Sequence, residues 1–265
     1  MLIRAALVAV LLTAVGCSSG AASDPNAPLR VGVSPTPHGE ILKHVADGLA
    51  KEKGLQIEIV EFTDYVQPNT ALVDGSLDAN YFQTLPYLET FTASSGASLQ
   101  WVGPVHLEPL GVYSKKHQKL TDLPDGAKIA IANDASNEAR GLKLLQAKGL
   151  VKVKAGTEET ATIRDIEDNP KKFEFIELEA AQLPRSLEDT DASVINGNYA
   201  IDAGLKPAFD ALALEEAKGS PYANGLVTRA ELKDDKRIKD LLELLRSQQV
   251  KDYIQQKFNG AVLAV

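Results

Sequence analysis

The stretch LRVGVSPTPHGEILKHVADGLAKEKGLQIEI, residues 29–59, decides the fold class because it carries two strand patterns around one helix pattern. Apolar and polar residues alternate from Leu29 to Val33 and again from Leu55 to Ile59, as in short strands. Between them apolar residues recur at helical spacing, Thr36-Pro37 is a suitable N-cap and first helical residue, and Gly54 ends the helix. A strand–helix–strand unit of this kind predicts a mostly parallel sheet covered by helices.

The same alternation of strand and helix patterns continues almost to the C-terminus. Strand patterns occupy residues 99–103, 110–114, 128–132, 173–178 and 192–195, and helix patterns occupy residues 135–148, 180–187, 238–245 and 250–258, with a further helix near residue 199. No Rossmann or P-loop glycine pattern accompanies them, so we predict two α/β lobes. Ligands of open α/β sheets bind at the carboxyl ends of strands, and we therefore expect binding residues just after the strands.

Residues 1–16 have the pattern of a secretory signal. Arg4 supplies a positive charge, and the apolar run that follows it is too short to span the roughly 30 Å of membrane hydrocarbon as a helix. Small residues directly precede Cys17, as in a lipobox, where the cysteine is acylated and becomes the new N-terminus. Ala14 stands where leucine is usual, and the alternative is an ordinary signal peptide with a cysteine near its cleavage site.

Cys17 is the only cysteine, so the chain can form no internal disulfide. Lipidation explains a lone thiol outside the cell better than a free, oxidation-prone side chain does. Residues 18–28, SSGAASDPNAP, are small, polar and interrupted by proline, which predicts a flexible tether after the lipidated cysteine. We therefore expect a protein anchored to the cell membrane by its N-terminal lipid and facing the extracytoplasmic side.

The net charge of the mature chain limits which partners it can bind. The full sequence has 28 Lys and Arg against 36 Asp and Glu, and removal of Arg4 with the signal leaves 27 against 36, a net charge of −9. Such a charge disfavours nucleic acid and anionic lipid as partners. Residues 29–265 are long enough for one large or two medium domains, and they contain no second apolar stretch that could cross a membrane.

The motifs of several enzyme classes are missing from the sequence. It has no P-loop, no CxxC, no HExxH and no GxSxG motif, and its four histidines, at positions 38, 44, 106 and 117, are scattered. We therefore predict no catalytic residues, no metal site and no cofactor.

One positive signal is NDASNEAR, residues 133–140, where a predicted strand passes directly into a helix. Helix N-termini present free N–H groups and a positive dipole end, so they bind anions. Asn137 and Arg140 are three residues apart and share one helix face, and Arg140 can hold a carboxylate through two parallel hydrogen bonds. The alternative is a capped helix with a surface arginine.

Two further segments carry candidate binding residues. Asn196 and Asn198 follow another predicted strand, and an amide can accept from an ammonium and donate to a carboxylate. An Asn-Gly turn explains the same residues without a ligand. Tyr65, Tyr81 and Phe82 are suited to wall an apolar side-chain pocket, although aromatic residues of this kind more often belong to a core.

Several of these segments, taken in order, resemble the NlpA/MetQ family, the lipoprotein methionine receptors of ABC importers. The resemblance runs from about Val31 to the C-terminus. It is carried by DYVQPN at 64–69, DANYFQ at 78–83, EPLGVYSKK at 108–116, NDASNEARGLKLLQ at 133–146, NPKKFEFIELEAAQLPR at 169–185, INGNYAIDAGL at 195–205 and SPYANGLVTR at 220–229.

The resemblance implies a type II periplasmic-binding fold, an α/β architecture with two lobes, two crossover strands and a ligand cleft that closes between them. Residues 29–109 and 224–265 are expected to form the first lobe, and residues 110–223 the second. The resemblance gives Arg140 the role of a carboxylate clamp, and Asn137 belongs to the same motif.

Further residue roles follow from the same resemblance. Asn224 and an amide of the Asn196/Asn198 pair resemble the residues that read the backbone of an amino acid, and Tyr65 and Phe82 resemble the walls of its side-chain pocket. His106, just before the expected crossover, is a candidate for the edge of the cleft.

One position departs from the family pattern. Many members read YFQH where this chain has YFQT, and the histidine normally edges the thioether pocket. Because Thr84 is smaller than histidine, we expect a wider or differently polar pocket while the backbone-reading residues stay intact.

The resemblance thus implies a lipid-anchored solute-binding protein that captures methionine, as the L- and also the D-form, and delivers it to the permease and ATPase of an ABC importer. One alternative keeps the fold and changes the ligand to another apolar amino acid or a methionine-containing dipeptide. A surface adhesin on the same scaffold is less favoured. An enzyme is also less favoured, since the sequence has neither a nucleophile–base pair nor a phosphate loop.

Overall fold

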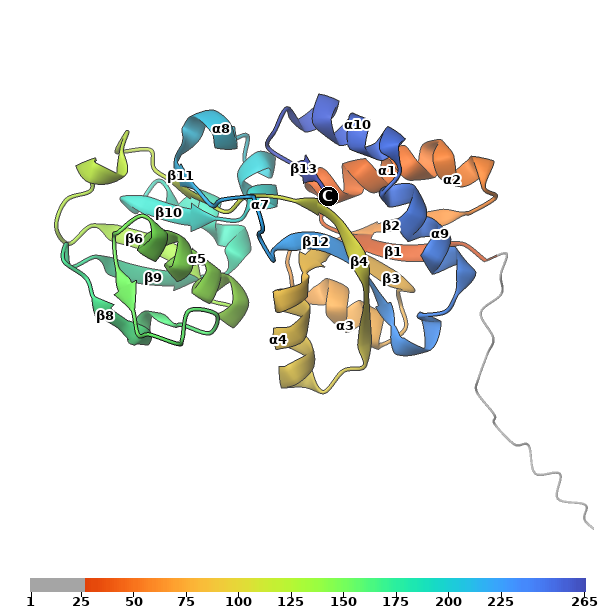
Figure 1. Cartoon of the computed structure of the whole chain (residues 1–265), viewed down its shortest axis with the longest axis horizontal. Coiled ribbons are helices and arrows are strands. Elements are labelled where there is room, and N and C mark those ends of the chain that lie inside the picture. Colours follow the sequence, from red (N-terminus) through yellow and green to blue (C-terminus); the bar gives the residue numbers. More distant parts are fainter. Residues whose placement is uncertain (1–26) are drawn as a thin grey trace, which may run out of the picture.

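A computed structural model describes residues 27–265, which form two α/β lobes side by side (Figure 1). The prediction of a two-lobed α/β fold is therefore confirmed. The predicted signal sequence, Cys17 and most of the predicted tether lie outside the described residues. The chain passes between the lobes twice, once after β4 (Leu99–Leu107) and once after β11 (Ala211–Leu214).

The first lobe is built on a mixed six-stranded sheet. Its spatial order is β13 (Leu263–Ala264), β4, β12 (Ala223–Arg229), β3 (Ala79–Thr84), β1 (Leu29–Val33) and β2 (Ile57–Glu61). β1 pairs in parallel with β2 and β3, as the strand–helix–strand pattern predicts, whereas β12 is antiparallel to β3 and β4. The lobe therefore combines chain from both ends of the described sequence.

Helices cover both faces of this sheet. They are α1 (Glu40–Asp47), α2 (Leu49–Glu52), α9 (Lys236–Leu245) and α10 (Gln248–Phe258) on one face, and α3 (Gln67–Val73) and α4 (Leu85–Ser95) on the other (Figure 1). Leu241 of α9 packs in one buried cluster with Val31 of β1, and Leu72 of α3 packs in another with Val227 of β12. Burial of these apolar stripes is the main force that holds each layer in place.

The second lobe repeats this three-layer plan on a five-stranded sheet. The sheet has the order β11, β5 (Gly111–Tyr113), β10 (Ala192–Ile195), β6 (Lys128–Ala132) and β9 (Glu174–Leu178). Its helices are α5 (Ala135–Ala147), α6 (Leu183–Ser186), α7 (Gly197–Asp202) and α8 (Pro207–Asp210), and a small separate hairpin joins β7 (Lys152–Val153) to β8 (Ile166–Asp168). Ile131 packs with Leu142 of α5 on one face, and Ala130 packs with Leu183 of α6 on the other.

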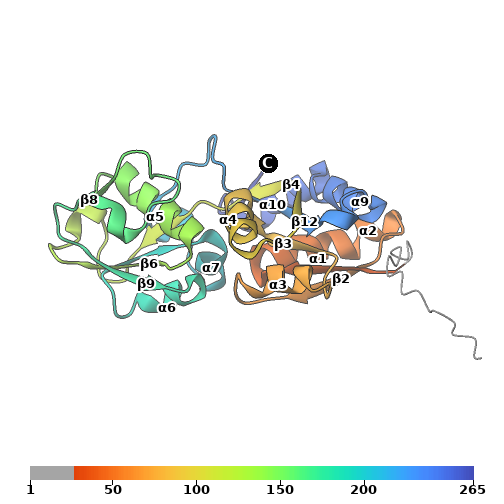
Figure 2. The ribbon, with the colours of Figure 1, turned by 90° about the horizontal axis from the view of Figure 1, so that it is seen from below.

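Parallel pairing brings two helix N-termini together at the edge of the second sheet that faces the first lobe. β6 leads into α5, β10 leads into α7, and the two strands are parallel neighbours. α7 accordingly lies at the boundary between the lobes (Figure 2), where it contacts residues Pro35–Gly39 of the first lobe. This is the strand-end position at which open α/β sheets bind ligands.

Two element boundaries differ from the sequence-based prediction for local reasons. The α-helix α1 begins at Glu40 and follows a separate π-helical turn over Pro35–Gly39, inside which Thr36, the residue before a proline, has an extended backbone with φ −120° and ψ 135°. β2 begins at Ile57 rather than at Leu55, since the Leu55 N–H bonds the Ala50 carbonyl at 2.8 Å in the turn that ends the preceding helix.

The sequence patterns do not predict β3 or β12, the two strands in the middle of the first sheet. All six residues of β3 are buried, so the strand shows no alternation of apolar and polar residues. Three of them are polar, and two of these, Asn80 and Gln83, are satisfied by a side-chain network in which they bond Asn69 of α3 at 2.6 to 2.9 Å. β4 also runs four residues beyond its predicted end at Gly103 and reaches Leu107, which brings His106 into the sheet.

Candidate ligand-binding site

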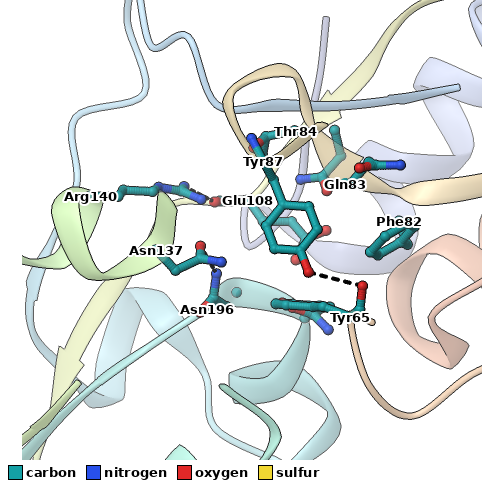
Figure 3. A pocket seen from close by; sticks show the side chains of 12 residues that line it. Tyr65, Phe82, Gln83, Thr84, Tyr87, Glu108, Asn137, Arg140 and Asn196 are labelled. Carbon is teal, nitrogen blue, oxygen red and sulfur yellow. Dashed lines mark hydrogen bonds between the residues drawn. The ribbon is translucent and has the colours of Figure 1, made fainter. Parts of the chain in front are cut away.

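A cleft between the two lobes brings all eight residues predicted to bind a ligand around one space. The cleft is lined by Tyr65, Phe82, Gln83, Thr84, Tyr87, Glu108, Asn137, Arg140, Asn196, Gly197, Asn198 and Asn224 (Figure 3). The first lobe supplies the aromatic residues and Asn224, and the second lobe supplies Arg140 and three asparagines. Glu108 comes from the first crossover between the lobes.

Three aromatic rings form one end of the cleft. The ring centroids of Tyr65, Phe82 and Tyr87 are 5.8 to 6.0 Å apart, and the Tyr87 hydroxyl donates to the Tyr65 carbonyl at 3.0 Å. In Figure 3 these rings lie on the opposite side of the cleft from Arg140 and Asn137. The cleft therefore has an apolar end and a polar end.

Tyr81, by contrast, belongs to the core. Its side chain is fully buried, and its hydroxyl bonds Nδ1 of His106 behind the cleft. The core interpretation is thus right for Tyr81, while Tyr65 and Phe82 reach the cleft.

Thr84 and Tyr87 enter the cleft together because α4 begins there. Thr84 is the N-cap of α4, and its hydroxyl accepts the Tyr87 N–H at 3.3 Å. Tyr87, which the sequence analysis does not single out, is the third residue of this helix. The combination of a capping threonine with an aromatic residue three positions later was the available signal.

Arg140 is buried, with only 4 % of its side chain exposed, so the alternative of a surface arginine is wrong. Asp134 caps α5, and this start places Arg140 one turn into the helix. Nε and Nη2 donate to the two carboxylate oxygens of Glu215 at 3.1 and 2.6 Å, and Nη2 also donates to the Glu108 carbonyl at 3.0 Å. The edge of the guanidinium that was expected to hold a ligand carboxylate is therefore occupied by Glu215, and Nη1 is the donor group left for the cleft.

A chain of hydrogen bonds fixes the orientation of Asn196. Both carboxylate oxygens of Asp134 accept from Nδ2 of Asn137 at 3.0 Å, so the Asn137 amide presents its oxygen to Asn196. Nδ2 of Asn196 donates to that oxygen at 2.7 Å. Oδ1 of Asn196 is then buried without a protein partner in the described part of the chain, and it remains an acceptor for a ligand.

The amides of Asn198 and Asn224 are turned the opposite way. Oδ1 of Asn198 accepts from the Tyr65 hydroxyl at 2.5 Å, and Oδ1 of Asn224 lies 3.1 Å from Nε2 of His38. Nε2 of His38 also faces Oε1 of Glu108 at 3.4 Å, so it has two acceptors as neighbours and must carry the proton. Both asparagines therefore offer Nδ2 donors.

Glu108 completes the polar end, although no sequence pattern predicts it. Its side chain is almost fully buried, and its Oε1 accepts from Nε2 of His106 at 2.6 Å. Gly197 allows this packing, since a Cβ there would lie 2.6 Å from the Cβ of Glu108. Glu108 follows a strand end, the position at which ligand residues are expected, but the predicted strand stops too early to show this.

Burial shifts the protonation equilibria of this cluster. Loss of hydration raises the pKa of the Glu108 carboxyl, and the neighbouring His38 and Arg140 oppose that rise. The same loss of hydration lowers the pKa of His38 to about 4 and that of His106 to about 3. At neutral pH both imidazoles are therefore uncharged.

The fold brings together two histidines that look scattered in the sequence. The ring centroids of His38 and His106 are 4.8 Å apart. Together with Glu108 these side chains offer three possible metal-ligand atoms, all within 4.8 Å of one another. The 2.6 Å between His106 and Glu108 is a direct hydrogen bond. Two ligands bound to one zinc ion at about 2.0–2.2 Å each lie farther apart than that, so the cluster is built as a hydrogen-bonded network. His106 lies behind the cleft rather than at its edge.

Two α/β lobes, two crossovers and a buried cleft with separate polar and apolar ends define a solute-binding protein of the type II periplasmic-binding class. The chain belongs to the NlpA lipoprotein family, whose family model matches residues 29–265.

Similar proteins share this architecture over nearly their whole length. The methionine-binding lipoprotein MetQ of Bacillus subtilis is 41% identical over 96% of this chain and 94% of its own. The D-methionine-binding lipoprotein MetQ of Escherichia coli is 42% identical over 95% of this chain and 93% of its own. A nutrient-binding protein of Burkholderia cenocepacia, whose structure is bound to methionine, is 46% identical, with a TM-score of 0.87 over 89% of this chain and 99% of its own. In residues 27–265 no helix is both long and apolar enough to span a membrane.

The buried histidines predict a loss of stability in mild acid. An unfolded histidine binds a proton below about pH 6.5, whereas His38 in the folded protein binds one only near pH 4. The unfolded state therefore takes up more protons in this window, and the free energy of unfolding falls as the pH falls. The loss for His38 is on the order of 3 kcal/mol at about 1.4 kcal/mol per pKa unit.

Urea unfolding at pH 7, 5.5 and 4.5 measures this loss. A His38→Gln variant can still donate to Asn224 but cannot titrate, so its stability should fall less steeply than that of the parent. His44, an exposed residue that stacks on Tyr253, provides the matched control His44→Gln, which should keep the parental slope. Equal slopes for all three proteins would show that His38 does not titrate as its burial requires.

Proposed function

We propose that this protein is an extracytoplasmic solute-binding lipoprotein that captures methionine in the cleft between its lobes and delivers it to the permease of an ABC importer. The observation that carries the proposal is the separation of donors from acceptors at the polar end of the cleft, opposite an aromatic wall. A free amino acid with an apolar side chain has the complementary groups: a carboxylate, an ammonium and an apolar side chain.

The donors are suited to the carboxylate. Nη1 of Arg140 and the amide nitrogens of Asn198 and Asn224 are left for a ligand by the hydrogen bonds that hold the rest of these side chains. A carboxylate removed from water needs such charge-assisted hydrogen bonds.

The acceptors are suited to the ammonium. Glu108 supplies a buried carboxylate, and Asn196 supplies an amide oxygen with no protein partner in the described residues. His38 and His106 are neutral at pH 7, so neither supplies a cation to Glu108, although His106 holds the carboxylate through a hydrogen bond. A ligand ammonium would provide the missing positive charge.

The aromatic end is suited to a thioether. Sulfur makes favourable contacts with aromatic rings, and the rings of Tyr65, Phe82 and Tyr87 surround this end. The names of the relatives above, two methionine-binding lipoproteins and a methionine-bound structure, support the same ligand.

The proposal includes a lipid anchor on Cys17, a permease and its ATPase as partners, and no role in catalysis. A relative from Coxiella burnetii, described as the periplasmic substrate-binding protein of an ABC transporter, supports the transport role. Mass spectrometry of the N-terminal peptide from membranes tests the anchor, and a peptide without an acyl mass would refute it.

A second candidate ligand is another apolar amino acid. The observation that favours it is Thr84, which lines the cleft where many family members have histidine. The threonine hydroxyl is engaged as the cap of α4, so this part of the wall is smaller and less polar than an imidazole.

Replacement of Arg140 by alanine should weaken methionine binding strongly. A carboxylate would lose its charged partner while remaining buried, a loss of roughly 2–5 kcal/mol, or about 30- to 4,000-fold in affinity. Calorimetry of Arg140→Ala and of the exposed control Arg164→Ala measures the difference, with thermal unfolding to verify that each variant is folded. A folded Arg140→Ala protein with parental affinity would mean that the carboxylate binds elsewhere.

Replacement of Thr84 by histidine should re-rank amino acids without abolishing binding. The change alters the wall of the cleft, where a difference of one methylene is worth about 1–3 kcal/mol, and it leaves Arg140 and Glu108 in place. Affinities of the parent, Thr84→His and the cap-preserving control Thr84→Ser for a panel of L-amino acids measure the ranking. If Thr84→His ranks the panel as the parent does, Thr84 does not face the ligand side chain.

A further inference from the structure

The arginine of the cleft carries a charge that the protein has already balanced. Glu215 binds the guanidinium of Arg140 through both carboxylate oxygens, and the two side chains are only 4 % and 15 % exposed. Screening by water is therefore weak, and the pair presents almost no net charge to the cleft. Glu215 is not one of the described residues that line the cleft. It therefore contacts Arg140 from behind, on the side away from the cleft.

Glu215 is well placed to hold this position because it joins the two crossovers. It directly follows β11, where the chain starts back toward the first lobe. Its backbone N–H donates to the Leu110 carbonyl at 2.9 Å, and its carboxylate accepts the Leu110 N–H at 3.3 Å. Leu110 lies two residues after Glu108 on the other crossover, so Glu215 is fixed at both its backbone and its side chain.

The remaining contacts of Arg140 also come from the crossovers. The Glu108 carbonyl accepts from Nη2, and the ring of Tyr222 stacks on the guanidinium at 4.4 Å from its centroid. Tyr222 is held in turn by Glu159, whose carboxylate accepts the tyrosine hydroxyl at 3.3 Å. Arg140 is thus fixed on one edge by Glu215 and on one face by Tyr222, and Nη1 alone remains for a ligand.

We propose that Glu215 is a specificity-determining residue that makes the cleft select ligands with no net charge. It cancels the positive charge of Arg140 and occupies two of its donors, so a carboxylate is held firmly only when the same ligand places an ammonium against Glu108 and Asn196. A ligand with a carboxylate alone brings a net negative charge into a cleft that also contains the Glu108 carboxylate. This inference rests on the proposed function, which places a zwitterionic amino acid between Arg140 and Glu108.

Three ligands with the same side chain test the roles of the carboxylate and the ammonium separately. L-Methionine is a zwitterion, methylthiobutanoate lacks the ammonium and is an anion, and methioninamide lacks the carboxylate and is a cation. Calorimetry with the parent and with Glu215→Gln gives three affinities for each protein. The glutamine keeps the shape of Glu215 and removes its charge.

We expect Glu215→Gln to weaken the cation relative to methionine by about tenfold, because only methionine has a carboxylate that gains when the buried negative charge beside it is removed. The anion should improve relative to methionine by a smaller factor, since the two share that carboxylate and only methionine also loses the attraction between its ammonium and Glu215. The adjacent, exposed Glu216 gives a matched control, and Glu216→Gln should leave both ratios within about twofold of the parent. Glu215→Asp keeps the charge, so it should retain the parental ratios even where all three affinities fall.

Equal changes for all three probes in Glu215→Gln would overturn the proposal and leave Glu215 with a purely structural role. The same re-ranking in Glu215→Asp would also overturn it, since charge would then not be the cause. If Glu215→Gln lacks a cooperative thermal transition, Glu215→Met, neutral and of similar length, replaces it in the same comparison. A parent protein that binds none of the probes would instead refute the proposed function itself, and the inference with it.

Discussion

A guanidinium buried away from water needs its charge and its N–H groups paired inside the protein, and Arg140 is the point at which this requirement shapes the structure. Its partners are Glu215, the Glu108 carbonyl and the ring of Tyr222, and all three belong to the crossovers between the lobes. The pairing of one buried charge therefore also fixes how the two connecting segments lie against each other. A change in either crossover would disturb the arginine, and a change in the arginine would leave a buried carboxylate unpaired.

The direction of each hydrogen bond fixes the side chains in the rest of the cleft. An amide can turn either end toward a ligand, and here each amide is turned by a partner in the protein. Asp134 turns Asn137 and, through it, Asn196, whereas His38 turns Asn224. His38 does so by donating from Nε2, and because its pKa is lowered, the form that donates at neutral pH is the uncharged tautomer with its proton on Nε2.

Sequence patterns predict those parts of the structure that depend on residues close together in the chain. β1, β6 and β10 have local alternation or apolar runs, and Asn137 and Arg140 follow from the start of a helix after a strand. β3 is hidden because its buried polar residues are satisfied by Asn69, a contact that no local pattern shows. Glu215 and the pair of His38 with His106 escape prediction for the same reason, since each gains its role from a partner far away in the chain. The binding roles of the eight predicted residues remain proposals, although the fold places all of them on one cleft.

Neither lobe contains a complete site. The aromatic end comes from the first lobe, while Arg140 and Asn196 come from the second. Two hydrogen bonds between the lobes lie beside the aromatic end, from Tyr65 to Asn198 and from Tyr199 to the Thr63 carbonyl. Tyr65 therefore both walls the apolar end and orients an amide of the other lobe, so the position of the lobes and the direction of a donor are linked. A ligand whose apolar side chain packs on Tyr65 and whose carboxylate lies near Asn198 would favour this arrangement of the lobes through both groups. A ligand with only one of these groups would favour it less.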